Sequence, residues 1–492
     1  MKGHVFLYIY MRIIIQPETL NMNHNTKQDP QLWNLVSNFE SGLKQGVQTY
    51  FDEKQYNDLI HYYEKEMMYE KALEVLSHAL VQYEYRSDFY LVKANLLLNI
   101  GQLDQAYKYL SKAENVAPYQ TEVKLLKAKV LAEDGRNVEA LNLLDFLKSA
   151  CLDQDLVEIF IRESYIFEKM KQFDLMFTSL SQALEINPSH AEALDRIWLS
   201  AELSRNYFKS INLHKRILDK DPYNYLAWYN LGHAFSSIGE YEDAIISLEY
   251  SFIINGEFKN GYLDCADLCF QLKKYHKSLE YYKDADKLFG PDSELKLFIS
   301  ECYINIGDVK EAKSNLFAAL KLDPYNDELY YNLAICYDRE ESWYKSINAY
   351  HKAISIEDNR EEYYLGLAKA YEAIDNDEKA IINFRKSTLT GLEQADYWVE
   401  FASYLLKKGM ISDSLIILNE AEEYTFSAGL VYCRAAYCFL NNNISEGVRL
   451  LEEALLEDYF QIDIFYSINP EFKIHSEIQA VVKYYARELN II

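Results

Sequence analysis

A period of 34 residues runs through most of this 492-residue chain, from Glu53 to about Gln461. Three positions of the period favour small side chains, and Gly, Ala or Ser fills 31 of these 36 places over twelve periods. The clearest column reads Ala72, Ala106, Ala140, Met176, Ser210, Ala244, Ser278, Ala312, Ser346, Ala380, Ser414 and Gly447. Self-similarity at such a spacing is typical of repeat proteins, in which each unit buries its apolar face against its neighbours. The period therefore predicts a stacked array.

Each period contains two apolar runs with helical spacing. In one period, Trp228 and Leu231 share a face of the first run, and Ala244 and Leu248 share a face of the second. Gly239 lies between the two runs, where it can adopt the left-handed conformation that ends a helix. Five of the eight prolines fall where one period hands over to the next, at Pro118, Pro188, Pro222, Pro291 and Pro324. The pattern predicts a helix-turn-helix unit.

The small column has a mechanical reason, because two helices approach closely only where the residue at their crossing is small. A large partner follows four residues later in nearly every period. These partners are Leu76, Leu110, Leu144, Leu180, Leu248, Tyr282, Leu316, Tyr350, Phe384, Leu418 and Leu451. His214 is the exception in this column.

These residues resemble the tetratricopeptide repeat family, whose pattern is matched by Trp228, Leu231, Gly232, Phe235, Ala244 and Leu248. It is matched again by Tyr330, Leu333, Ala334, Tyr337, Ser346, Tyr350 and Ala353. The resemblance implies an all-α, right-handed superhelical solenoid of helix-turn-helix repeats, with capping helices at both ends. It also implies that the first helix of each repeat lines a concave groove for partner segments. No three consecutive repeats carry the full Lys, Asn and Arg set of the family's carboxylate clamp.

We expect four segments. Residues 1–30 form an N-terminal extension that we expect to be poorly ordered, and residues 31–52 an N-terminal capping helix, with Leu32, Trp33, Val36 and Phe39 on one face. Residues 53–461 hold about twelve repeats. Residues 462–492 hold a C-terminal capping helix that begins at Asn469-Pro470-Glu471 and carries an apolar stripe of Ile474, Ile478, Val481 and Tyr485.

Net charge, hydropathy and cysteine content disfavour several classes of function and location. The chain has 76 acidic and 50 basic residues, a net charge of -26, which disfavours binding to nucleic acid or anionic membranes. The apolar stretch from Val5 to Ile15 is interrupted by Arg12 and is too short to span a membrane, and Met22 is an alternative start. Seven scattered cysteines do not describe a disulfide framework, so we expect a cytoplasmic protein.

No catalytic motif is present. Cys265 and Cys269 lie one helical turn apart and could hold a metal, but Cys at packed sites also behaves as a small apolar residue, which is the interpretation we favour. The sequence lacks a phosphate-cradling glycine loop and a nucleophile elbow. We expect no enzyme activity, no metal and no cofactor.

By resemblance, the groove passes through Arg162, Arg196 and Asn230, which are spaced by 34 residues, with Tyr165, Tyr229 and His233 nearby. Two guanidinium groups and an amide on consecutive repeats could hold a carboxylate. The alternative is that the arginines pair with Glu158, Glu192 and Asp195 of the same surface.

Further along, the groove is expected to be acidic. Asp264, Asp267, Glu301 and Glu400 lie deep in their helices, with Tyr331 and Asn332 beside them. Glu294, Glu328, Glu362 and Asp396 lie in first helical turns, where a carboxylate also favours the helix dipole. These acidic residues could bind a basic partner segment, or they could only stabilise the helices that carry them.

The leading hypothesis is a non-catalytic scaffold that binds a protein or peptide segment in its groove. The first alternative is a structural subunit that associates with itself or organises a larger complex. The second alternative is an RNA-binding array or a regulatory array that senses a small ligand. RNA binding conflicts with the net charge and with the lack of a basic stripe.

Overall fold

The computed structural model describes residues 30–45, 49–149, 153–489 and 491. Within these residues it contains 27 α-helices, two short 3-10 helices and no strand, so the all-α prediction is confirmed. The predicted N-terminal extension lies, except for Pro30, outside the described residues. The chain divides into two compact units, Met1–Glu240 (unit 1) and Tyr241–Ile492 (unit 2).

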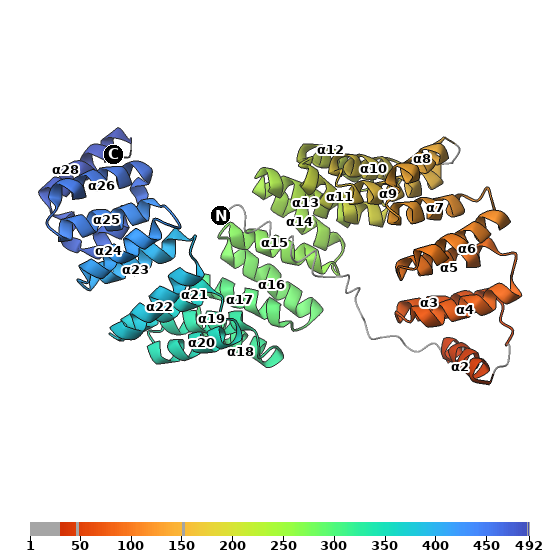
Figure 1. Ribbon diagram of the computed structural model, residues 1–492, viewed down its shortest axis with the longest axis horizontal. Coiled ribbons are helices and arrows are strands. Elements are labelled where there is room, and N and C mark those ends of the chain that lie inside the picture. The colour runs from red at the N-terminus through yellow and green to blue at the C-terminus, as the bar shows by residue number, and fades with distance from the viewer. Residues whose placement is uncertain (1–29, 46–48, 150–152, 490, 492) are drawn as a thin grey trace. The chain divides into compact units, whose positions relative to one another are not determined.

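Unit 1 begins with one helix and continues with helix pairs (Figure 1). Its helices are α2 (Pro30–Gln45), α3 (Glu53–Lys65), α4 (Tyr69–Gln82), α5 (Ser87–Asn99), α6 (Leu103–Val116), α7 (Thr121–Glu133), α8 (Asn137–Lys148), α9 (Asp153–Lys169), α10 (Phe173–Ile186), α11 (Ala191–Ser204), α12 (Tyr207–Lys220) and α13 (Tyr225–Ile238).

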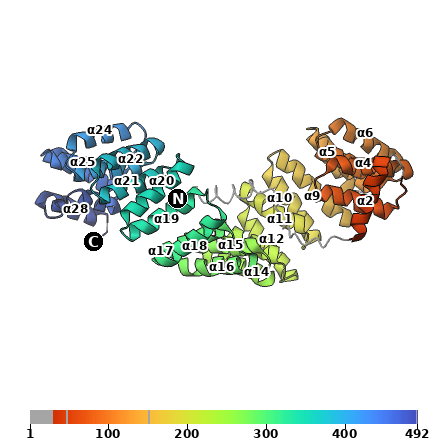
Figure 2. The same cartoon turned by 90° about the horizontal axis from the view of Figure 1, so that it is seen from below.

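Unit 2 continues the same pattern, and its pairs can be followed from a second direction in Figure 2. Its helices are α14 (Tyr241–Ile254), α15 (Lys259–Gln271), α16 (Tyr275–Phe289), α17 (Ser293–Ile306), α18 (Val309–Leu322), α19 (Asp327–Arg339), α20 (Trp343–Ile356), α21 (Glu361–Ala373), α22 (Asp377–Thr390), α23 (Ala395–Lys407), α24 (Ile411–Ala421), α25 (Ala428–Leu440) and α26 (Ile444–Glu457). The short helices η1 (Tyr459–Gln461), α27 (Ile462–Ile468) and η2 (Pro470–Lys473) follow, and α28 (Ser476–Glu488) comes last.

The small column of the sequence period lies in the core of the stack. All twelve of its residues, from Ala72 to Gly447, are buried. Around Ala312, for example, the cluster contains Leu297, Ile304 and Leu316 from the two paired helices of one repeat. The predicted register is therefore confirmed.

The turn inside each repeat contains one residue with left-handed backbone. These residues are Met67, Gly101, Gly135, Lys171, Arg205, Gly239, Lys273, Gly307, Glu341, Asp375, Gly409 and Asn442, one per repeat. Seven of the twelve are not glycine, although a side chain makes this conformation costly. Each repeat needs this left-handed residue because a tight turn joins its two packed helices.

The N-terminal capping helix differs in part from the prediction. Helix α2 ends at Gln45, and Asp52 instead caps α3 in a capping box with Gln55. Val36 and Phe39 are buried as expected, but Trp33 is 49% exposed. Leu35 and Leu43 pack in its place, because they lie one turn before and one turn after Phe39, on the side that faces the first repeat.

The C-terminal prediction was wrong about the start of the last helix. Asn469 does cap a helix, but this is the single-turn η2, and α28 begins only at Ser476. Phe472 is buried and its ring stacks on that of Phe465, with centroids 4.5 Å apart, so tertiary packing fixes this turn. Ile474 is consequently 77% exposed and does not belong to the apolar stripe.

Ile478 is fully buried, and Val481 and Tyr485 pack against the same core, as the sequence predicts.

Candidate partner-binding surface

The predicted binding residues lie on the first helices of their repeats, in both units. In unit 1 they occupy α9, α11 and α13, and in unit 2 they occupy α15, α17, α19 and α23. We call the first set the unit 1 face: Arg162, Tyr165, Arg196, Tyr229, Asn230 and His233. We call the second set, with two neighbouring glutamates, the carboxylate face: Asp264, Asp267, Glu301, Glu328, Tyr331, Asn332, Glu362 and Glu400.

The arginines of the unit 1 face are paired with carboxylates. Arg162 forms an ion pair with Glu158, one turn earlier on α9. Arg196 reaches back to α9, where one nitrogen lies 2.5 Å from Glu168 and another donates to the Ser164 hydroxyl at 2.6 Å. The Arg196 side chain is only 14% exposed. Both guanidinium charges are thus neutralised within the unit, which favours the pairing alternative, although Glu168 was not among the predicted partners.

Tyr165 joins this network. The guanidinium carbon of Arg196 lies 3.3 Å from the centroid of the Tyr165 ring, a cation–π arrangement. The Tyr165 hydroxyl donates to Glu192 at 2.8 Å. Burial raises the pKa of Tyr165. The ring is therefore fixed in place by one cation and one carboxylate.

Aromatic rings continue the unit 1 face. The His233 ring stacks on Trp198 with centroids 5.5 Å apart, and Tyr229 meets His233 edge-on at 4.5 Å. Asn230 is buried, and its amide donates to the Leu194 carbonyl at 2.8 Å. Asn230 therefore ties α13 to α11 and does not present its amide at the surface.

The carboxylate face holds acids near one another. Burial, together with the nearby charges of Glu328 and Asp267, raises the pKa of Glu301 to about 7. Asn332 opposes this shift with a hydrogen bond of 3.4 Å to Glu301. The Tyr282 hydroxyl donates to Asp267. Three acids from α15, α17 and α19 thus share one stretch of surface.

Glu362 extends this surface onto α21. Burial raises its pKa, and Glu361 and Glu328 contribute in the same direction, while Arg360 opposes them. Burial likewise raises the pKa of Tyr331 to about 12, with Glu362 as the next cause. The sequence analysis considered Glu328 and Glu362 only as helix-dipole residues, and their mutual repulsion shows that they also build a shared negative potential.

Two cations lie on the carboxylate face. Arg360 contacts Glu328 at 2.9 Å and Glu362 at 3.5 Å, and Lys369 contacts Glu400 at 2.8 Å. Both cations pair with acids of this face, and its six acids outnumber them: Asp264, Asp267, Glu301, Glu328, Glu362 and Glu400. The face therefore keeps a net negative charge.

Sequence reasoning missed two aromatic members of this surface. Tyr363 donates to Asp327 at 2.6 Å and its ring lies 4.8 Å from that of Tyr331. Burial raises the pKa of Tyr397, and Glu361 and Glu362 act in the same direction. Tyr363 and Tyr397 are 34 residues apart, so the period could have identified both as members of one column.

Asn332 is buried and donates to the Glu328 carbonyl at 3.1 Å, as well as to Glu301. Like Asn230, it supports the surface from beneath.

The described cysteines are packed in the core. Cys265, Cys269, Cys302, Cys336, Cys433 and Cys438 are all buried and free. In the part of the chain that the structure describes, no three His, Cys, Asp or Glu side chains are placed to hold a metal ion. None of the described helices combines the length and the apolarity that a bilayer span requires.

Comparison with known proteins identifies individual repeats. Models of the tetratricopeptide repeat match residues 87–120, 215–246 and 293–326. The chain is similar to TPR repeat-containing protein YpiA of Bacillus subtilis (strain 168), with 22% identity over 389 residues, 72% of this chain and 91% of that protein.

A second relative is the Homo sapiens protein O-mannosyl-transferase TMTC3, with 20% identity over 351 residues. That likeness covers 65% of this chain and 38% of the transferase. Among solved structures, that of the APC/C hetero-tetramer Cut9-Hcn1 is 14% identical, covers 82% of this chain and 97% of the matched chain, and has a TM-score of 0.35.

The matched segment 87–120 spans the pair α5 and α6, and 293–326 spans the pair α17 and α18. In both pairs the small residues of the 34-residue period lie buried at the helix crossing, at Ala106 and Ala312. Because repeats of this kind are matched in both units and the same period continues between them, the chain is a tetratricopeptide repeat protein.

Proposed function

We propose that the chain is a non-catalytic, cytoplasmic scaffold that binds a basic segment of a partner protein on its carboxylate face. The observation that carries this proposal is the placement of Asp267, Glu301 and Glu328 on the first helices of three consecutive repeats, where their charges and burial together raise the pKa of Glu301 to about 7. Keeping a carboxyl group charged in that position costs free energy, because it is buried and lies near other negative charges. A lysine or arginine from a partner would remove that cost.

Charge distribution supports the same assignment. From Tyr241 onward the chain has 44 acidic and 25 basic residues, against 32 and 25 before it. Unit 2 therefore carries -19 of the net charge and unit 1 only -7. Complementary charge chiefly provides specificity and rapid association, so the acidic unit favours a basic partner over a neutral one.

Aromatic side chains give this face points of attachment. Tyr331 and Tyr397 are partly exposed among acids, whereas Tyr363, from the repeat between them, is buried and packs against the Tyr331 ring. Rigid rings of this kind make good anchors, because little conformational entropy is lost on binding. Lysine and arginine side chains can also stack on them.

The unit 1 face is a second candidate surface, which lies wholly within unit 1. Its arginines are already neutralised, so Arg162, Tyr165, Arg196, Tyr229 and His233 would bind through ring and stem contacts more than through charge. Asn230 would support them from below.

The test is an affinity capture from source-cell lysate at pH 6 and pH 8, followed by mass spectrometry. The protein is compared with Glu301→Gln/Glu328→Gln, which removes two charges and keeps their shape. The matched control is Glu257→Gln/Glu280→Gln, at two exposed glutamates of unit 2. We expect the protein and the control to enrich the same few partners, more strongly at pH 8 because Glu301 is then ionised. Glu301→Gln/Glu328→Gln should fail to enrich these partners at either pH value.

Capture of the same proteins by all three forms would contradict the proposal. If the only protein recovered is the chain itself, and its oligomers dissociate on dilution in sedimentation measurements, the self-associating subunit replaces the receptor.

A further inference from the structure

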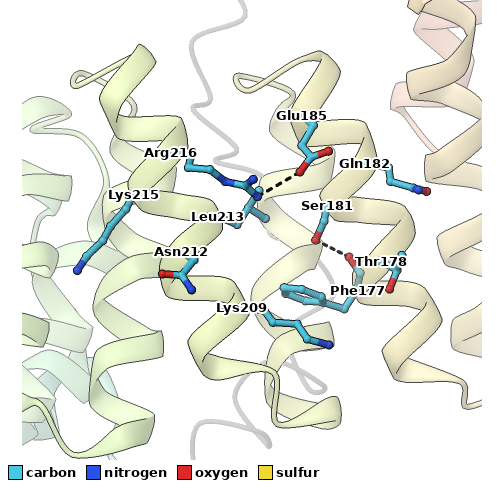
Figure 3. Close-up of a pocket in the computed structure, with 10 residues that line it drawn as sticks. All are labelled: Phe177, Thr178, Ser181, Gln182, Glu185, Lys209, Asn212, Leu213, Lys215 and Arg216. Atoms are coloured by element: carbon cyan, nitrogen blue, oxygen red, sulfur yellow. Dashed lines mark hydrogen bonds and ion pairs between the residues drawn. The ribbon is translucent and has the colours of Figure 1, made fainter.

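A hollow with a volume of about 630 Å³ lies between α10 and α12 of unit 1, on second helices of two successive repeats (Figure 3). It is separate from both faces described above, which lie on first helices. Buried Phe177 and Leu213 form its apolar floor. Polar side chains surround them: Thr178, Ser181, Gln182, Glu185, Lys209, Asn212, Lys215 and Arg216.

The hollow is basic in a strongly acidic protein. Three cations, Lys209, Lys215 and Arg216, line it together with a single carboxylate, that of Glu185, which lies 3.1 Å from Arg216. Lys209 and Lys215 make no ion pair with any described residue. Lys215 instead lies over the Phe235 ring, 5.3 Å from its centroid.

The helix that carries these cations is itself unusual in charge. Helix α12 has four basic residues, Lys209, Lys215, Arg216 and Lys220, against Asp219 alone. The chain as a whole has three acids for every two bases. Positive charge and an apolar floor therefore occur together here.

We propose that this hollow binds an acidic peptide segment of a partner protein, in which carboxylates flank one apolar side chain. The apolar side chain would lie on Phe177 and Leu213, and the carboxylates would meet Lys209, Lys215 and the free side of Arg216. Asn212, Gln182 and Thr178 offer hydrogen-bond donors to the segment's backbone. A nucleic-acid backbone fits less well, because the chain's charge of -26 repels a long polyanion whereas a short segment needs only local complementarity.

This inference does not rest on the carboxylate face. The two surfaces have opposite charge, so they select partners of opposite chemistry, and one can fail without the other.

The test uses the full chain and an array of 12-residue peptides. Each peptide carries four glutamates around one Leu, Phe or Tyr at varied spacing, and matched arrays replace every glutamate by Gln or by Lys. The variant is Lys209→Glu/Lys215→Glu. The control is Lys54→Glu/Lys108→Glu, which changes the charge equally at two exposed lysines of unit 1 that make no ion pair. Circular dichroism checks that all three forms are folded.

We expect a subset of the glutamate peptides to bind the protein and the control alike. The hollow variant should bind them about tenfold more weakly, and binding should weaken as NaCl is raised. The Gln and Lys arrays should not bind. Equal binding by all three forms, or no glutamate peptide that distinguishes them, would overturn the proposal. Self-association of the protein that the hollow variant alone abolishes would show that a second copy, and not a peptide, occupies the hollow.

Discussion

His214 is the one residue of its column that breaks the pattern of large apolar side chains, and the structure buries it completely. Its Nδ1 lies 2.8 Å from the Ser210 carbonyl, and its Nε2 has no partner among the described residues. Burial lowers the pKa of His214 to about 4, and the hydrogen bond to Ser210 only partly opposes this. The imidazole is therefore neutral in the folded chain at neutral pH.

A depressed histidine pKa makes the fold sensitive to mild acid. Below pH 6.5 the unfolded chain binds a proton that the folded chain does not, so stability falls as the pH drops from 6.5 towards 4. We expect the α12 amides to lose about 2 kcal/mol of protection between pH 7 and pH 5.

His214→Leu, which restores the residue type of most repeats, should remove this loss, as measured by hydrogen exchange. His276→Leu, at an exposed position, is the control and should leave it unchanged. Equal pH dependence of the protein and the His214 variant would show that other groups cause it.

At the scale of single helices, the sequence predicted the repeat register well, because the small side chains at helix crossings are a local requirement with a fixed period. Ala312 is fully buried where that register places it. The sequence predicted less well those contacts that form between residues far apart in the chain. The contact of Arg196 with Glu168 joins two helices, and the burial of Phe472 depends on aromatic rings from α25 and α27. No period in the sequence encodes such contacts.

The buried crossings give a direct test of packing. We expect Ala312→Leu to overpack the α17–α18 pair and to lower the unfolding free energy by about 1–3 kcal/mol. Ser314→Leu, at an exposed site of the same helix, should change it by less than about 0.5 kcal/mol. Chemical denaturation followed by circular dichroism measures both. A fully tolerated leucine at position 312 would mean that this crossing is looser than its burial indicates.

The turns inside the repeats offer a second prediction at this scale. Glu341 has a φ of 54° where Gly307, one repeat earlier, has 96°. We expect Glu341→Gly to stabilise the chain by about 1 kcal/mol, because glycine adopts this backbone without steric cost. Gly307→Ala should destabilise it by a similar amount, and no atom within 4 Å would clash with the added methyl group. Thermal unfolding of the two variants in opposite directions is the expected result.

For the whole molecule, net charge determines how stability responds to salt. Unit 2 carries -19 and unit 1 -7, and repulsion among like charges destabilises a compact state. Surface ion pairs, which salt weakens, occur in both units. We therefore expect NaCl to raise hydrogen-exchange protection more in α15–α21 than in α3–α8. The same response in both sets of helices would contradict this expectation.

The unequal division of charge also has a kinetic consequence. Charge attracts or repels a diffusing molecule before any contact forms, and it can change association rates by about 10 to 1,000-fold at low ionic strength. A basic protein would thus be drawn first towards the C-terminal half of the chain, and the cations of α12 would attract an acidic one locally. The order in which two such partners arrive would then depend on ionic strength, even where their final affinities are equal.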